Sequence, residues 1–94
     1  METNPDYMRD FSFFLRRSRL QASLSQADVA SIIGIHTRLI CSWETGTTLP
    51  SKERTRSVVN AYQTNFEEFF ARYNLARDQN EKFKDAIRSV RRKR

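Results

Sequence analysis

The chain has 94 residues, of which 38% are hydrophobic, and this allows one domain with one modest core. Only two glycines and two prolines are present, which favours long helices over many short strands, and no stretch has the roughly eighteen apolar residues of a membrane helix. The formal net charge of +6 indicates an anionic partner, either nucleic acid or an acidic surface.

The first predicted helix begins at Pro5-Asp6 and runs to about residue 21. Proline is tolerated in the first turn of a helix, and aspartate is favoured at the positive end of the helix dipole. Phe11, Phe14 and Leu15 share one face at helical spacing. We therefore expect this face to be buried.

Two short helices are predicted next, from residue 26 to about 33 and from residue 37 to about 45. Ser25 is a suitable N-cap for the first of them, and Asp28 three residues later completes a pattern like a capping box. Gly34 stands where a left-handed residue is needed to end that helix. The apolar positions that would form a core shared by the two helices are Val29, Ile33, Ile35, Ile40 and Trp43.

Two more helices complete the prediction. Gly46 ends the third helix, and Ser51 caps a fourth helix from residue 52 to about 63, with Val58, Val59 and Tyr62 facing inward. Asn65 is a candidate N-cap for a helix over residues 66–90, with Glu68 at the capping-box position. Asn74 is a candidate interruption of it.

The last predicted helix carries an apolar stripe along most of its length. A dense aromatic part comes first and a weaker part follows, and the members at three- and four-residue spacing are Phe66, Phe69, Phe70, Tyr73, Phe83, Ile87 and Val90. A run of four basic residues, 91–94, ends the chain. The sequence shows no internal repeat and no strand signal.

The two short helices meet at Gly34 within the segment SQADVASIIGIHTRLICSWE, residues 25–44. A close crossing of two helices needs a small residue where they touch, which Ala30 supplies, and a glycine at the turn. A pair built in this way places its second helix in the major groove of DNA, while the first helix crosses the backbone.

This segment resembles the lambda-repressor-like helix-turn-helix family, which includes phage repressors, Cro proteins and many bacterial regulators. The stretches LRRSRLQASLSQADVA and SWETGTTLPS resemble the first helix of that family and the exit of its recognition helix. The sequence departs from the family at His36, where a capping serine is frequent, and at Ser23, where glycine is frequent. The resemblance covers about residues 15–70 and implies an all-α fold, a five-helix lambda-repressor-like DNA-binding domain over residues 6–73. The residues that follow this family core, 74–94, are expected to be a C-terminal helical extension with a basic tail.

The resemblance and the helical spacing together indicate a DNA-facing surface. Arg38 is the only long donor opposite the inward-facing side of the third helix, and it could bind guanine O6 and N7, or simply contact a phosphate or water. The candidate base contacts are His36, Thr37, Arg38 and Ser42. The candidate phosphate contacts are Gln26, Thr45, Thr47, Thr48 and Lys52. Both His36 and Thr37 have simpler alternatives. His36 could be a surface histidine at a helix start, and Thr37 could be the cap of its helix.

Two further positions match the family for a structural reason. The resemblance implies that Arg19 and Glu44 form a buried or half-buried ion pair, which ties the first helix to the third. Cys41 is the single cysteine, and it is expected to be a small residue near a crowded face with no redox role. A lone cysteine also fits a reducing compartment, so we expect a cytoplasmic protein, or a nuclear one if the source is eukaryotic.

These observations favour a sequence-specific transcriptional regulator, most simply a repressor that binds double-stranded DNA at a palindromic operator as a homodimer. The expected dimer interface is Phe69, Phe70, Tyr73, Phe83 and Ile87. In the competing account, the same C-terminal helix packs only within its own chain. A surface on the second helix is also a candidate contact for RNA polymerase or a regulatory protein.

The sequence leaves a second class of function open, that of an antitoxin-type module that binds DNA and also a partner protein through its C-terminal segment. An enzyme is not expected. The chain has one histidine and one cysteine, no glycine-rich phosphate loop and no pair of carboxylates in a recognisable catalytic arrangement. We likewise expect no cofactor, no metal and no membrane partner.

Overall fold

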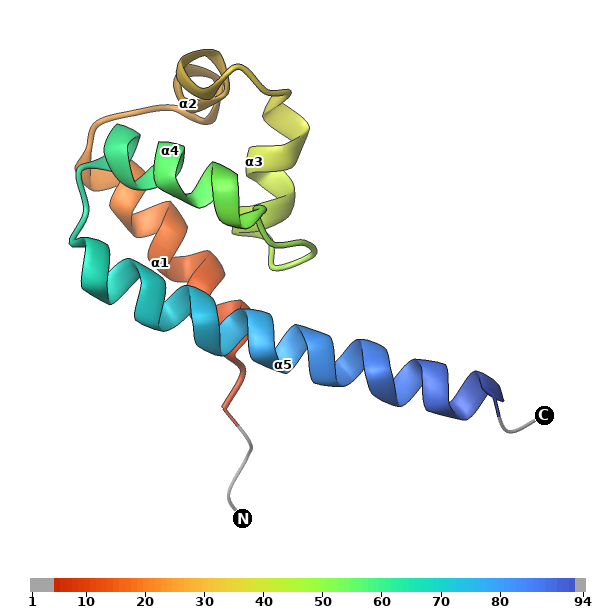
Figure 1. The fold of residues 1–94 in the computed structure, drawn as a ribbon. Helices are drawn as coiled ribbons and strands as arrows, with labels where there is room; N and C mark the ends of the chain where they lie inside the picture. Colours follow the sequence, from red (N-terminus) through yellow and green to blue (C-terminus); the bar gives the residue numbers. More distant parts are fainter. Residues whose placement is uncertain (1–4, 93–94) are drawn as a thin grey trace.

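A computed structural model describes residues 5–92, and these residues form five α-helices and no strand (Figure 1). The helices are α1 (Tyr7–Gln21), α2 (Gln26–Ile33), α3 (Thr37–Glu44), α4 (Lys52–Tyr62) and α5 (Phe66–Arg92). The first four helices and the beginning of α5 pack together, while the rest of α5 projects away from them. The predicted all-α fold, with five helices and an extended C-terminal helix, is confirmed.

The start of each of the first two helices is fixed by a capping side chain. The Asp6 carboxylate accepts a hydrogen bond from the Arg9 backbone N–H at 3.0 Å. Ser25 and Asp28 form the predicted capping box, with two reciprocal bonds of 2.9 Å, and the bond from the Ser25 N–H lowers the pKa of Asp28. The predicted caps of the two later helices are also present, at Ser51 and Asn65.

All five helices contribute to one core. Its buried hydrophobic residues are Phe11, Phe14, Leu15, Val29, Ala30, Ile40, Trp43, Val58, Val59, Tyr62, Phe69, Tyr73 and Ala76. The predicted inward faces of α1 and α4 are therefore confirmed, and Ile33 and Ile35 are half-buried beside them. Phe11 lies where α1 meets α5, and its ring packs edge-on against Phe69 with 5.4 Å between the ring centroids.

Two of the residues predicted for a dimer interface lie inside this core. Phe69 is fully buried and Tyr73 is 3% exposed, and the Tyr73 hydroxyl donates a 2.9 Å hydrogen bond to the Pro50 carbonyl. A side chain covered by its own chain has no surface to offer a second copy, so the structure corrects the prediction for these two residues. Phe70 is half-buried, whereas Phe83 and Ile87 are exposed.

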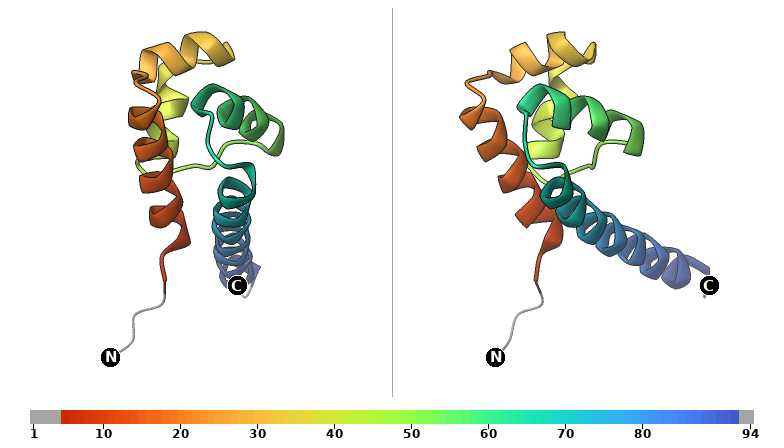
Figure 2. Two further views of the ribbon diagram at one scale, coloured as in Figure 1. Left: turned by 90° about the vertical axis from the view of Figure 1, so that its left-hand side faces the viewer. Right: turned by 60° about the vertical axis from the view of Figure 1, so that its left-hand side comes forward.

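The expected interruption of the last helix at Asn74 is wrong, because α5 is continuous through this position. Asparagine costs a helix only a few tenths of a kcal/mol, about 0.7 at most, and packing against α1 overrides so small a preference. Gln79, beyond Asn74, holds the start of α1: its Oε1 accepts from the Tyr7 N–H at 2.8 Å, and its Nε2 donates to the Pro5 carbonyl at 2.8 Å. The turned views agree that, within residues 5–92, no other helix runs beside the distal part of α5 (Figure 2).

Candidate nucleic-acid interface

The crossing of α2 and α3 is fixed at the turn between them. Ala30 is 5% exposed at the crossing, and its carbonyl accepts 2.9 Å hydrogen bonds from the N–H groups of both Gly34 and Ile35. Gly34 has φ of +80°, in the left-handed region that residues with a Cβ adopt only with strain. The direction in which α3 leaves the turn is therefore set by backbone geometry.

One face of α3 is exposed to solvent because the opposite face of the helix is buried in the core. Ile40 and Trp43 point into the core, which leaves Thr37, Arg38 and Cys41 exposed. Among these three, only Arg38 has a long side chain with several donors. The structure thus brings the predicted base-contacting residues Thr37 and Arg38 to one accessible surface.

His36 has a structural role that the sequence left open. Its Nδ1 accepts a hydrogen bond from the Arg38 backbone N–H at 3.1 Å, so His36 is the N-cap of α3. Thr37, the other candidate for this cap, is the first residue of the helix. A histidine therefore does here what a serine hydroxyl does at other helix starts, and only its Nε2 remains for a contact to DNA.

The residues at the exit of α3 are joined by their hydroxyl groups. Ser42 Oγ lies 2.6 Å from Thr48 Oγ1, and Thr45 Oγ1 lies 3.1 Å from Thr47 Oγ1. Thr45 also donates to the Ser42 carbonyl at 3.2 Å. Ser42 is half-buried within this network, so it reaches a base less freely than Arg38 does.

The two remaining predicted phosphate contacts stand at helix N-termini. Gln26 is the first residue of α2 and Lys52 is the first residue of α4, and backbone N–H groups at such ends are suited to binding anions. Gln26 Nε2 donates to Glu44 Oε1 at 3.3 Å, which orients its side chain at the end of α3. Lys52 is exposed at the point where the α3–α4 connection ends.

A buried ion pair joins α3 to α1. Arg19 Nε and Nη2 donate to the two carboxylate oxygens of Glu44 at 2.7 and 2.9 Å, and Arg19 Nη1 donates to the Leu24 carbonyl at 2.8 Å. The two side chains are only 9% and 4% exposed. The hydrogen bonds to Glu44 raise the pKa of Arg19, and burial raises the pKa of the neighbouring Tyr62 hydroxyl. The predicted pair thus links α1, the α1–α2 connection and the last residue of α3.

This geometry agrees with the comparison to known families, in which a family model described as a helix-turn-helix domain matches residues 10–69. The chain belongs to the helix-turn-helix domain family. Within the matched residues, α2 and α3 are the two helices joined by the turn at Gly34, which is the arrangement of a helix-turn-helix. Membership indicates a DNA-binding regulator. No curated protein matches the chain.

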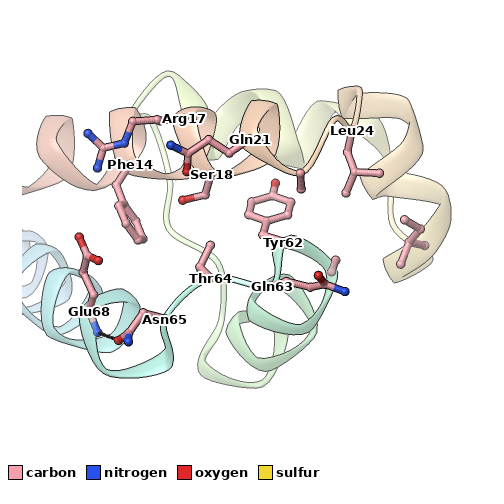
Figure 3. Close-up of a pocket in the computed structure, with 13 residues that line it drawn as sticks. Phe14, Arg17, Ser18, Gln21, Leu24, Tyr62, Gln63, Thr64, Asn65 and Glu68 are labelled. Atoms are coloured by element: carbon pink, nitrogen blue, oxygen red, sulfur yellow. Dashed lines mark hydrogen bonds between the residues drawn. The ribbon is translucent and has the colours of Figure 1, made fainter.

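A groove lies away from the helix-turn-helix surface. This groove, of about 760 Å³, separates the end of α1 from the α4–α5 connection, and hydroxyl and amide groups line much of it (Figure 3). None of its lining residues belongs to α3 or to the α3–α4 connection, so it takes no part in the surface described above. Within residues 5–92, no helix is both long and apolar enough to cross a lipid bilayer.

Proposed function

We propose that the protein is a sequence-specific transcriptional repressor that binds a palindromic operator as a homodimer. The observation that carries this proposal is the exposed face of α3, where Arg38 stands on a recognition helix held at both ends. The His36 cap holds the start of the helix, and the ion pair to Glu44 holds its end. Selection of bound duplexes from a random-sequence pool tests it, because a repressor of this kind enriches one half-site repeated in two-fold symmetry.

In this proposal the base-contacting and the phosphate-contacting side chains have different roles. Arg38 reads a base, by two hydrogen bonds to guanine O6 and N7, and Thr37, Ser42 and the Nε2 of His36 make shorter contacts beside it. The phosphate contacts, which fix the register of the domain on the duplex without reading sequence, are Gln26, Thr45, Thr47, Thr48 and Lys52.

Replacing Arg38 with alanine should weaken binding to the selected operator by about 1–3 kcal/mol and relax the preference at one position of each half-site. The matched control is Lys52→Ala, which should weaken binding to all sequences alike and lower the salt dependence by about one phosphate contact. The measurement is fluorescence anisotropy on the operator and on its single-base variants. A proportional loss on every variant for Arg38→Ala would show that Arg38 does not read a base.

The homodimer is supported by the uncovered end of the apolar stripe on α5. The side of this helix that buries Phe69 and Ala76 continues outward as three exposed residues, Phe83 (65% exposed), Ile87 (39%) and Val90 (73%). Pairing this stripe with its copy on a second chain would cover it. The resulting two-fold dimer would present two recognition helices to half-sites about one helical turn apart, roughly 34–36 Å.

The double substitution Phe83→Ser/Ile87→Ser should convert the dimer to a monomer and reduce operator affinity, while the helical content stays close to that of the unmodified chain. Sedimentation velocity and circular dichroism measure these quantities. The control is Phe13→Ser, which removes a similarly exposed ring from the outer face of α1 (58% exposed, against 65% for Phe83) and should leave the dimer intact. A variant that remains dimeric would place the interface elsewhere.

The same uncovered stripe favours the second candidate function, an antitoxin-type module. In that case residues 74–90 would cover their apolar side against a partner protein, and the chain alone would not self-associate. A monomer at tens of micromolar in the unmodified chain, combined with operator binding, would favour this alternative over the homodimer.

A further inference from the structure

The distal part of α5 projects on the side of the domain where α3 lies (Figure 1). Ala76 is the last fully buried residue of α5 among those described, and the helix continues to Arg92. At 1.5 Å per residue, this projecting part is roughly 24 Å long. A duplex seated against α3 would therefore have α5 extending along its flank.

One side of the projecting part is basic. Arg77, Lys84 and Arg88 are separated by seven and four residues, which places them in one line along the helix, and all three are exposed. This line lies about a third of a turn from the apolar stripe of Phe83 and Ile87. The two surfaces can therefore be used at the same time, one by DNA and the other by a second chain.

Two residues of the basic line, Arg77 and Lys84, face the exit of the recognition helix. A groove between α5 and the α3–α4 connection is lined by Thr47 and Thr48 on one side and by Arg77 and Lys84 on the other. The two threonines are among the phosphate contacts proposed above. Glu81 lines the same groove, and its negative charge opposes the binding of an anion there. Arg88 lies 3.6 Å from Asp85 in an exposed ion pair, and little free energy is needed to separate such a pair.

We propose that Arg77, Lys84 and Arg88 form a second phosphate-binding surface, with which α5 contacts the DNA backbone beside the base pairs read by α3. The inference rests on the proposed function, because it requires that α3 seats the domain on a duplex. The charge of the duplex supplies the driving force, since each cation that neutralises a phosphate releases condensed counterions. The basic run of residues 91–94 adds to the positive charge at this end of the chain.

The test compares two substitutions with the same charge change on the same helix. Lys84→Gln removes a cation from the proposed surface, whereas Lys82→Gln removes one from the far side of α5, where Lys82 pairs with Asp78 at 3.1 Å. The full chain is titrated against a fluorescein-labelled 30-base-pair duplex of mixed sequence at several salt concentrations. Lys84→Gln should lower the slope of log K against log salt by about 0.9 and weaken binding several-fold, and Lys82→Gln should leave the slope nearly unchanged.

Two further measurements distinguish the loss of a phosphate contact in Lys84→Gln from a change in its oligomeric state. Glu81→Gln should tighten binding, because it removes a like charge from the phosphate path, and sedimentation should give the Lys84→Gln variant the oligomeric state of the unmodified chain. Equal slopes for Lys84→Gln and Lys82→Gln would overturn the second surface even if the unmodified chain binds DNA with a steep salt dependence. Absence of salt-dependent binding by the unmodified chain would instead overturn the proposed function itself.

Discussion

Replacing Glu44 with alanine should lower the free energy of unfolding by about 3–5 kcal/mol. The substitution leaves the Arg19 guanidinium, whose side chain is 9% exposed, without its carboxylate partner in a site that water hardly reaches. Gln26 loses an acceptor as well. Urea denaturation followed by circular dichroism measures the change. A small domain has only about 5–15 kcal/mol of stability in total, so this variant should be near the limit of folding.

The control for this prediction is the exposed pair between Arg72 and Asp10, in which the single Arg72 Nη1 donates to both carboxylate oxygens at 2.8 and 2.9 Å. Solvent screens this pair, since its side chains are 31% and 50% exposed, and Asp10→Ala should cost less than about 1 kcal/mol. A double change, Arg19→Met with Glu44→Leu, should restore most of the stability lost by Glu44→Ala, because it leaves no unpaired charge. Equal costs for Glu44→Ala and Asp10→Ala would show that the buried pair does not tie α1 to α3.

Replacing Phe69 with alanine should destabilise the domain by about 3–5 kcal/mol. Phe69 is fully buried at the centre of the contact between α1 and α5, with its ring centroid 5.4 Å from that of Phe11 and 6.0 Å from that of Phe14. Alanine would leave a cavity between two helices that cannot close freely, because other contacts hold them apart. Thermal and urea unfolding of the variant give the size of the loss.

Phe83→Ala is the matched control, since it removes the same ring from an exposed position of the same helix. The stability of the monomer should change by no more than about 0.5 kcal/mol in this variant. Similar losses for both variants would mean that the distal part of α5 is covered within its own chain. The pair of substitutions therefore separates the core portion of the aromatic stripe from its exposed portion.

The sequence predicted best those features that depend on neighbouring residues. The capping box of Ser25 and Asp28, the left-handed Gly34 and the cap at Asn65 are each specified within a few residues, and the structure has all three. The Arg19–Glu44 pair is a long-range contact, and it was predicted only because the resemblance supplied both positions. Six of the ten helix bounds agree with the expected ones, and the other four differ by one or two residues.

The features that the sequence could not decide are set by tertiary packing. Helical spacing puts Phe69 and Phe83 on the same stripe, but only the position of α1 determines that the former is buried and the latter exposed. Asn74 has a weak helix propensity, which contacts on either side of it override. His36 caps α3 because its ring is oriented with Nδ1 toward the Arg38 N–H, and the sequence does not specify this orientation. The hydrogen bonds of Gln79 join residues that are far apart in the chain, so no local pattern predicts them.

The bonds of Gln79 have a consequence for the order in which the domain can assemble during protein synthesis. Its side chain holds the backbone of Tyr7, and the two residues are separated by 72 positions. At a translation rate of about 5–20 residues per second, α1 is made roughly 4–14 seconds before the segment that fastens it. Phe11 and Phe14 therefore spend seconds uncovered on the nascent chain, whereas collapse of a finished chain takes about 10–100 microseconds. The amphipathic α1 therefore exposes its aromatic face during synthesis until the residues of α5 that cover it have been made.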